Sequence, residues 1–143
     1  PLEFGGRATD RPCPADPRLD CNEVYGKFVS ELWFTWRVVI EAEQMRGLTE
    51  GIVSEGQSRA WKQVSRSGSG TAIQDVEPKE ETKERLGRSP DDADMTVCAV
   101  ELARRLGFRI GKLDWRGKYS ENQLLKLKEE WDRLLAKREL KAA

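Results

Sequence analysis

The sequence predicts an α/β chain that is rich in helices. Two capping boxes, Asp20–Glu23 and Ser120–Gln123, each precede apolar residues at helical spacing. Ser89 followed by Pro90 is a third helix-start signal, because serine favours the N-cap and proline the first helical position. The stretches with strand character are short, and they lie at Leu2–Phe4, Thr71–Val76 and Phe108–Leu113.

Length and composition limit the kind of chemistry that the chain can perform. Its 143 residues fit one domain with a modest core, and 25 basic residues balance 25 acidic ones. A net charge of zero excludes a protein that binds nucleic acid through bulk basicity alone. The absence of histidine excludes Ser–His–Asp and Cys–His catalysis and zinc sites that need imidazole. Acid–base or metal chemistry must therefore use carboxylates.

Cysteine content and hydropathy predict the setting of the chain. Cys13, Cys21 and Cys98 form no C-x-x-C pair, which argues against a disulfide scaffold or a cysteine-rich metal site and favours reduced thiols. The longest apolar stretch, Leu32–Ile40, is interrupted by a threonine and an arginine and is far shorter than the roughly 20 residues of a membrane span. No signal peptide is visible. We expect a cytoplasmic chain with no membrane contact.

The first half of the chain predicts one long helix. A turn-rich stretch with three prolines precedes it. The predicted helix begins at the Asp20–Glu23 capping box and ends at Gly47. Its aromatic and aliphatic residues cover more of the helix surface than a single apolar stripe would. We therefore expect the helix to pack on two sides or to contact a partner. Core packing is a better explanation than base stacking for Trp33 and Trp36, because almost no basic residues are interleaved with them.

The middle of the chain is predicted to hold shorter elements. A second segment runs from about Leu48 to Trp61, and residues 65–70 form a loop rich in serine and glycine. After the strand at Thr71–Val76, a charged connection over residues 79–88 is partly helical. The helix that follows Ser89 ends at Gly107. Its predicted core-facing stripe consists of Met95, Cys98, Ala99, Leu102 and Leu106.

The last predicted helix extends from the Ser120–Gln123 capping box to about Leu140. Residues 109–141 carry ten basic and six acidic side chains. This excess fits either a solvated amphipathic helix or an appended tail with a slightly basic face. The apolar residues of its predicted face are Leu124, Leu127, Trp131, Leu134 and Leu135.

Asp91, Asp92 and Asp94 stand in the first turn of the helix that follows Ser89. On a helical wheel of about 100° per residue, Asp91 falls on the side of the apolar stripe, and the other two fall on its borders. A carboxylate on the core-facing side needs a partner or a cation. The three acids are explained either by capping and dipole stabilisation, or by a metal site built on Asp91, with or without Asp94. Oxygen ligands favour Mg²⁺ or Mn²⁺, and acids from other elements must complete such a site.

The segment Val76–Asp94 resembles the end of the nuclease domain in phage terminase large subunits. That family shows a strand, a lysine-rich connection and an S-P-D-x-A-D motif that opens a helix, which matches Ser89–Asp94 here. Phe4–Ala8 resembles the family's strand and glycine turn. Asn22–Gly47 resembles its long helix with tryptophans, and Gln57–Trp61 resembles the basic and aromatic segment that follows.

The resemblance implies a partial RNase H-like nuclease domain over residues 1–111, with a helical tail over residues 112–143. Such domains use a few convergent acids to hold metal ions that activate water at a DNA phosphate. Asp91 matches the family's last metal-ligand and catalytic acid, and Asp94 matches the second aspartate of the motif. The resemblance begins after the strands that carry the family's earlier acids, and the phosphate-binding loop of the ATPase domain is missing. We therefore expect a fragment of an Mg²⁺- or Mn²⁺-dependent DNA endonuclease that is inactive alone.

The resemblance also implies partners. Double-stranded DNA is the expected substrate, and other terminase subunits or the portal are expected to contact the tail. Four cations that precede Asp91 either contact DNA phosphates beside the cleavage site or pair with the neighbouring glutamates 80, 81 and 84. These cations are Lys79, Lys83, Arg85 and Arg88. The alternative from a different class is a non-enzymatic interaction module whose aromatic helix and tail helix bind a partner.

Overall fold

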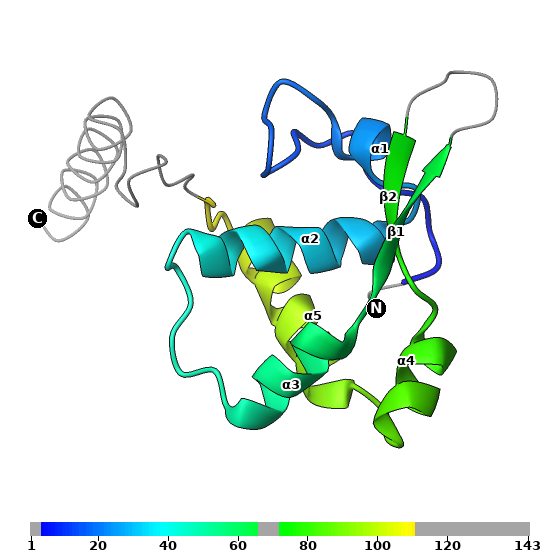
Figure 1. Cartoon of the computed structure of the whole chain (residues 1–143). Coiled ribbons are helices and arrows are strands. Elements are labelled where there is room, and N and C mark those ends of the chain that lie inside the picture. Colours follow the sequence, from blue (N-terminus) through cyan, green and yellow to red (C-terminus); the bar gives the residue numbers. More distant parts are fainter. Residues whose placement is uncertain (1–3, 66–71, 111–143) are drawn as a thin grey trace, which may run out of the picture. The chain divides into compact units, whose positions relative to one another are not determined.

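The computed structural model describes residues 4–65 and 72–110, which belong to the first of two units, Pro1–Ile110 and Gly111–Ala143. This part is a mixed α/β fold, in which five helices accompany one antiparallel sheet of two strands (Figure 1). The α/β class and the predominance of helices are thus confirmed. The predicted tail helix over residues 120–140 lies outside the described residues. Within the described ranges, no helix is long and apolar enough to cross a membrane.

The first predicted helix is two helices, α1 (Cys21–Val24) and α2 (Phe28–Glu41). The capping box that begins α1 is confirmed, because Glu23 Oε2 accepts the Asp20 N–H across 2.7 Å. The helix then breaks, since Tyr25 is extended and pairs with Gln74 of the sheet. Gly26 permits this close approach, because a Cβ there would lie 2.7 Å from the Asp75 carboxylate. The prediction of one continuous helix is therefore wrong.

The end of α2 also differs from the prediction. The helix stops at Glu41 rather than at Gly47. Glu43 has a φ of 54°, and a right-handed α-helix cannot continue through a residue with positive φ. The chain then folds back along the helix, because Trp36 Nε1 donates to Met45 Sδ across 3.3 Å. Gly47, with a φ of 75°, belongs to the connecting loop.

Helix α3 (Glu50–Ser58) and the hairpin follow. Thr49 caps α3 by accepting the Ile52 N–H across 3.3 Å. Strand β1 (Trp61–Ser65) pairs with β2 (Ala72–Val76) in a register that places Trp61 opposite Val76. The prediction of a strand that Pro78 follows is confirmed by β2. The sequence did not predict β1, whose side chains are mostly exposed and show no clear alternation.

The other two predicted strands do not form where the structure describes them. Phe4 lies in a turn, and residues 108–110 have no strand structure. Residues 1–3 and 111–113 lie outside the described ranges. The segment after Phe4 instead makes isolated backbone pairs, Arg7 with Lys27 and Pro12 with Asp20.

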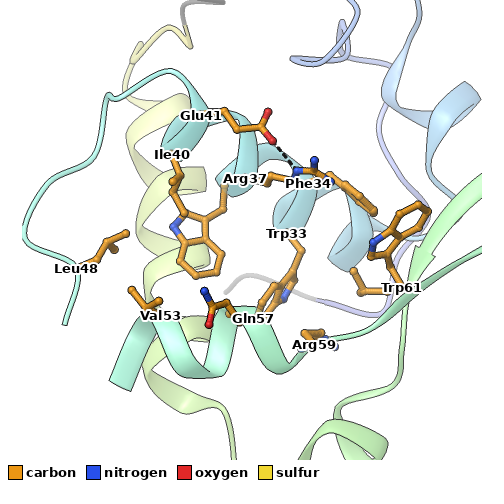
Figure 2. A pocket seen from close by; sticks show the side chains of 13 residues that line it. Trp33, Phe34, Arg37, Ile40, Glu41, Leu48, Val53, Gln57, Arg59 and Trp61 are labelled. Atoms are coloured by element: carbon orange, nitrogen blue, oxygen red, sulfur yellow. Dashed lines mark hydrogen bonds and ion pairs between the residues drawn. The ribbon is translucent and has the colours of Figure 1, made fainter. Parts of the chain in front are cut away.

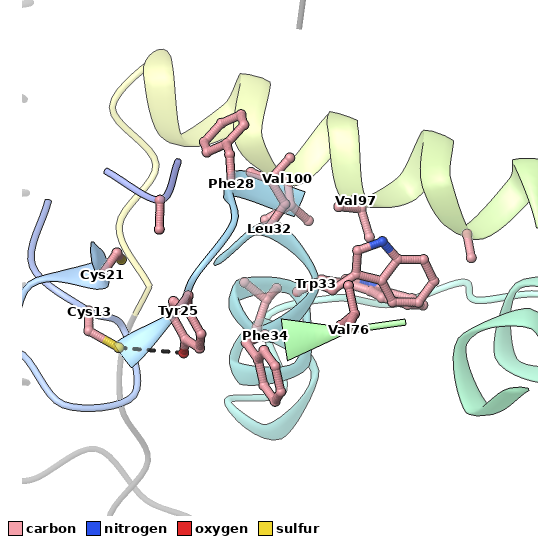
Figure 3. Packing of buried hydrophobic residues seen from close by; sticks show 14 residues of the cluster. Cys13, Cys21, Tyr25, Phe28, Leu32, Trp33, Phe34, Val76, Val97 and Val100 are labelled. Atoms are coloured by element: carbon pink, nitrogen blue, oxygen red, sulfur yellow. Dashed lines mark hydrogen bonds between the residues drawn. The ribbon is translucent and has the colours of Figure 1, made fainter. Parts of the chain in front are cut away.

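Helix α2 is the centre of the core. It packs against α5 (Asp91–Arg105) and against β2, which confirms that its broad apolar surface is covered on two sides (Figure 3). Trp33 and Trp36 are only 6% and 4% exposed, so they are core residues as predicted. Gly56 of α3 lets the Trp36 ring approach, because a Cβ on this glycine would lie 2.7 Å from it.

The last two described helices contain most of the segment that resembles terminases. The charged connection forms α4 (Lys79–Leu86), which ends at Gly87 in the left-handed conformation with a φ of 70°. In α5 the N-cap is Pro90 rather than the predicted Ser89. Ser89 Oγ instead donates to Asp91 Oδ1 across 2.7 Å.

The face of α5 that enters the core is not the predicted apolar stripe. Met95, Leu102 and Leu106 are 73%, 56% and 80% exposed, respectively. The helix buries a different set of residues, three of which are apolar. The fourth is Glu101, which is fully buried and accepts hydrogen bonds from arginine side chains. The stripe prediction left these residues out and is wrong. The residues that α5 buries are Ala93, Val97, Val100 and Glu101.

Candidate functional site

The candidate site lies at the first turn of α5, where three segments meet. Lys79 Nζ, from the start of α4, lies 2.8 Å from Asp91 Oδ1 and 2.8 Å from Asp94 Oδ2. Arg59, which follows α3, places Nη1 3.3 Å from Asp94 Oδ1. We call these four residues the Asp91 cluster: Asp91, Asp94, Lys79 and Arg59. It brings together the two carboxylates and the lysine that the sequence singled out and adds Arg59 from a distant position.

The two carboxylates differ in exposure. The Asp91 side chain is 72% exposed and that of Asp94 is 15% exposed. The expectation that Asp91 points toward the core is therefore wrong, because α5 turns its other face inward. Asp91 is open to solvent and could exchange its cation, whereas Asp94 is held from both sides.

Charge stabilises the ionised forms in the cluster. Hydrogen bonds from Lys79 and Ser89 lower the pKa of Asp91. Hydrogen bonds to Asp91 and, to a smaller extent, to Asp94 raise the pKa of Lys79. One ammonium group thus lies between the two carboxylates at the positively polarised end of α5. The pair of carboxylates therefore attracts a cation at this point of the fold.

Two buried glutamates shape the segments that carry the cluster. Glu55 of α3 is fully buried, accepts the Ala93 N–H across 2.9 Å and pairs with Arg88. It thereby fixes the start of α5 to α3. The burial of Glu55 was not predicted from the sequence, because a lone acidic residue in a polar helix carries no signal of burial.

Glu77 holds the turn between the sheet and α4. It accepts the Ala60 N–H across 3.0 Å and the Thr82 hydroxyl across 2.8 Å, and it pairs with Arg85. Burial raises the pKa of Glu77, but the bonds from Arg85, Ala60 and Thr82 outweigh this effect and bring it to about 2. Glu77 is therefore a structural carboxylate that keeps Lys79 in place.

The four cations proposed to contact DNA mostly have partners within the fold. Lys79 pairs with Asp91 and Asp94, Arg85 with Glu77, and Arg88 with Glu55. These partners are not the neighbouring glutamates that the surface-pairing alternative named. Three of the four cations therefore support the local fold. Lys83 is exposed on α4, where its charge helps to lower the pKa of Asp91.

The cluster contains two of the ligands that a metal site needs. Among the residues that the structure describes, no group of three or more histidine, cysteine, aspartate or glutamate side chains is placed to hold a metal ion. Asp91 and Asp94 offer carboxylate oxygens, which suit Mg²⁺ or Mn²⁺. Chemically, the described arrangement can bind one cation between two carboxylates but cannot by itself enclose it.

A second feature, a pocket of about 460 Å³, lies between α2, α3 and the sheet (Figure 2). Arg59 joins it to the Asp91 cluster, because its guanidinium carbon lies 4.7 Å from the Trp33 ring centroid. The buried tryptophans were predicted from the sequence, but the pocket and Arg59 were not. The aromatic wall of the pocket consists of Trp33, Phe34, Trp36 and Trp61.

Comparisons of this chain with protein-family models, with curated proteins and with solved structures gave no match. The interpretation of the site therefore depends on the geometry of the Asp91 cluster and on the motif at Ser89–Asp94. In the structure, the exposed Asp91 of this motif is the first residue of α5.

Proposed function

We propose that residues 1–111 are the C-terminal part of an RNase H-like nuclease domain from a phage terminase large subunit. Such a protein packages viral DNA and cuts double-stranded concatemers with Mg²⁺ or Mn²⁺. In this proposal Asp91 supplies the last metal-ligand acid, with Asp94 beside it. The resemblance of Ser89–Asp94 to the family motif and the exposure of Asp91 support it.

The observation that carries the proposal is the shared cation of Asp91 and Asp94. Lys79 Nζ lies 2.8 Å from an oxygen of each carboxylate, so the pair already selects a positive charge. Asp91 differs from the buried glutamates of the fold because its side chain is 72% exposed. A divalent ion can therefore reach it from solvent and displace the lysine.

The chemistry follows from this exchange. A divalent ion at this position would supply activation of water and stabilisation of the leaving oxygen at a DNA phosphate. The chain's own residues have simpler tasks: Asp91 and Asp94 would hold the ion, and Arg59 keeps Asp94 oriented. Lys79, once displaced, would be free to neutralise a phosphate, and Lys83 on the same helix adds a second positive charge. The described residues place no third acid at this point, so we expect the chain alone not to cleave.

Metal binding tests the proposal. Mn²⁺ titration of the full chain, followed by electron paramagnetic resonance of the free ion, should show one weak site that Asp91→Asn removes. Asp92→Asn is the matched control, because Asp92 is exposed in the same turn and lies outside the cluster. Equal binding by the wild-type chain and Asp91→Asn would falsify the proposed role of Asp91.

Cleavage is the second test. Supercoiled plasmid incubated with the chain and Mn²⁺ should stay intact, since the part of the chain that the structure describes brings only two acids to the metal site. Cutting by the wild-type chain that disappears in Asp91→Asn would show that the residues present are sufficient. That result would overturn the view of the chain as an incomplete nuclease.

The non-enzymatic interaction module remains the second candidate function, favoured by one observation. Met95, Leu102 and Leu106 form an exposed apolar face on α5. If this face serves only association, Leu102→Lys should make the chain sediment as a smaller species and leave Mn²⁺ binding unchanged. Unaltered sedimentation would argue against the module.

A further inference from the structure

The pocket between α2, α3 and the sheet has no part in the proposed nuclease function. Its volume of about 460 Å³ lies within the range of roughly 300–1,000 Å³ that is typical of small-molecule sites. Three of the apolar residues that line it, Ile40, Val53 and Trp61, are exposed. The apolar lining therefore reaches the protein surface, and a ligand can enter from solvent.

Aromatic rings in the pocket wall form two edge-to-face pairs (Figure 2). The ring centroids of Trp33 and Trp36 lie 5.5 Å apart, and those of Phe34 and Trp61 lie 5.7 Å apart. Trp61 is 48% exposed, so part of its ring has no protein neighbour and is available for stacking. These rings favour a flat aromatic ligand over an aliphatic one.

Two buried nitrogen atoms of residues in the pocket wall carry N–H groups without an acceptor. Trp33 Nε1 and Arg59 Nε form no hydrogen bond within the part of the chain that the structure describes. The two residues are adjacent, because the Arg59 guanidinium carbon lies 4.7 Å from the Trp33 ring centroid. A buried donor without an acceptor is rare and destabilising. A ligand atom that accepts from these groups would remove that cost.

The charged side chains that line the pocket already have partners. Arg37 Nε lies 2.7 Å from Glu41 Oε1 at one side of the pocket. Arg59 uses Nη1 for Asp94, across 3.3 Å, and Nη2 for the Glu77 carbonyl, across 3.0 Å. A charged ligand would therefore enter an apolar site without a counter-ion, which is costly. This pairing favours a neutral ligand, whose acceptor is a carbonyl oxygen rather than a carboxylate.

We propose that this pocket binds a neutral, flat aromatic molecule whose carbonyl oxygen accepts hydrogen bonds from Trp33 Nε1 and Arg59 Nε. The two unpaired donors carry the proposal, the aromatic wall determines the shape of the ligand, and the paired charges determine its neutrality. Both nitrogens are buried behind the lining, so binding includes a small movement of neighbouring side chains. The proposal does not depend on the nuclease function.

Nuclear magnetic resonance of the full chain tests the proposal. The tryptophans are labelled with ¹⁵N, and their indole N–H signals are recorded as coumarin is added, because coumarin is neutral, flat and carries a carbonyl oxygen. Trp33→Phe and Trp61→Phe identify two of the signals by their loss. We expect saturable shifts of both, with the Trp33 proton moving downfield as it gains an acceptor. No saturation in the millimolar range, or a saturable shift that spares Trp33, would overturn the proposal.

Two further probes test the chemistry of the ligand. Indole is also flat and aromatic but has no carbonyl oxygen, and coumarin-3-carboxylate adds a negative charge. We expect each to bind at least about tenfold more weakly than coumarin, because the first leaves the two donors unpaired and the second brings an uncompensated charge. Equal affinity for indole would contradict the role of the donors. Equal affinity for the carboxylate would contradict the requirement for a neutral ligand.

Substitutions separate the hydrogen bond from the shape of the pocket. Trp33→Phe removes one unpaired N–H and keeps an aromatic ring, so coumarin should bind about tenfold more weakly, as followed by the Trp61 signal, while indole binding changes little. Leu106→Ala is the control, because Leu106 is exposed on the surface outside the pocket lining and its loss should leave both affinities unchanged. Equal losses for coumarin and indole in Trp33→Phe would refute the hydrogen bond. Far-ultraviolet circular dichroism checks the folding of Trp33→Phe, and the comparison of probes on the wild-type chain decides the question if that variant is unfolded.

Discussion

Two regions of this chain pair carboxylates with cations at similar distances but in opposite surroundings. The first, which we call the Arg11 network, has fully buried carboxylates, and Arg11 lies 2.8 Å from Glu31 and 3.0 Å from Glu101. In the Asp91 cluster, Lys79 meets Asp91 at 2.8 Å, but that carboxylate is 72% exposed. The Arg11 network consists of Arg11, Glu31, Glu101, Arg104 and Arg105.

The difference in exposure separates a structural role from an available site. A carboxylate enclosed by protein cannot change its partner unless the fold opens, and its loss leaves hydrogen-bond donors inside the fold without an acceptor. An exposed carboxylate contributes little to stability and can exchange its cation with solvent. Similar distances in the two regions therefore carry different consequences for stability and for ion binding.

The largest effect should come from Glu31→Ala. Glu31 accepts the Thr9 N–H across 2.7 Å as well as the bond from Arg11, so the substitution breaks the link between the N-terminal segment and α2. We expect a loss of about 3 kcal/mol in the free energy of unfolding, measured by urea denaturation. The control is Glu41→Ala, which removes an exposed pair with Arg37 and should cost less than about 0.5 kcal/mol. Similar losses in both variants would remove the distinction between the two regions.

A packing change should come next in size. Gly56→Ala places a Cβ 2.7 Å from the buried Trp36 ring, so we expect a loss of about 1–3 kcal/mol in urea denaturation. Gly51→Ala in the same helix is the matched control, because its nearest contact would be 3.6 Å, and helix propensity predicts a gain of up to about 1 kcal/mol. Mn²⁺ binding by folded Gly56→Ala should persist, since the change leaves the Asp91 cluster intact.

Acid should destabilise the chain through Glu77. Its pKa is about 2 in the folded state instead of 4.5, so the unfolded chain binds more protons between these values. Its contribution, about 2–3 kcal/mol, is fully present above pH 4.5 and is lost as the pH falls toward 2. Urea denaturation across this range should show a shallower pH dependence for Glu77→Gln than for the wild-type chain. Parallel curves would contradict the assigned role.

The smallest effect on stability should come from Asp91→Asn. The carboxylate is exposed, so the free energy of unfolding should stay close to the wild-type value although the ion pair with Lys79 is lost. The same variant should lose Mn²⁺ binding. A loss of stability as large as that of Glu31→Ala would show that Asp91 is structural.

Local signals in the sequence predicted the elements whose causes are local. The Asp20–Glu23 capping box marks the start of α1, and Pro78 marks the end of β2. The break at Tyr25 could not be predicted in the same way, because it depends on pairing with Gln74. Strand β1 was missed because its pairing with β2, rather than its own side chains, makes it a strand.

The candidate site was predicted only where its causes are local. Its two carboxylates lie on one helical turn, so spacing alone brought them together. The predicted orientation of Asp91 was wrong, because α5 buries the face that carries Val97 and Glu101, and the burial of this carboxylate depends on its arginine partners. Arg59 lies 35 positions before Asp94, and no periodicity connects two such positions.

Arg59 restricts how this molecule can vary. It is one side chain with two sets of neighbours: its guanidinium lies over the Trp33 ring and also donates to Asp94. A substitution that adapts the aromatic pocket would therefore disturb the carboxylates, and a change at Asp94 would leave a buried cation beside the tryptophan. Among diverged descendants of this chain, positions 33, 59 and 94 should change together or stay unchanged.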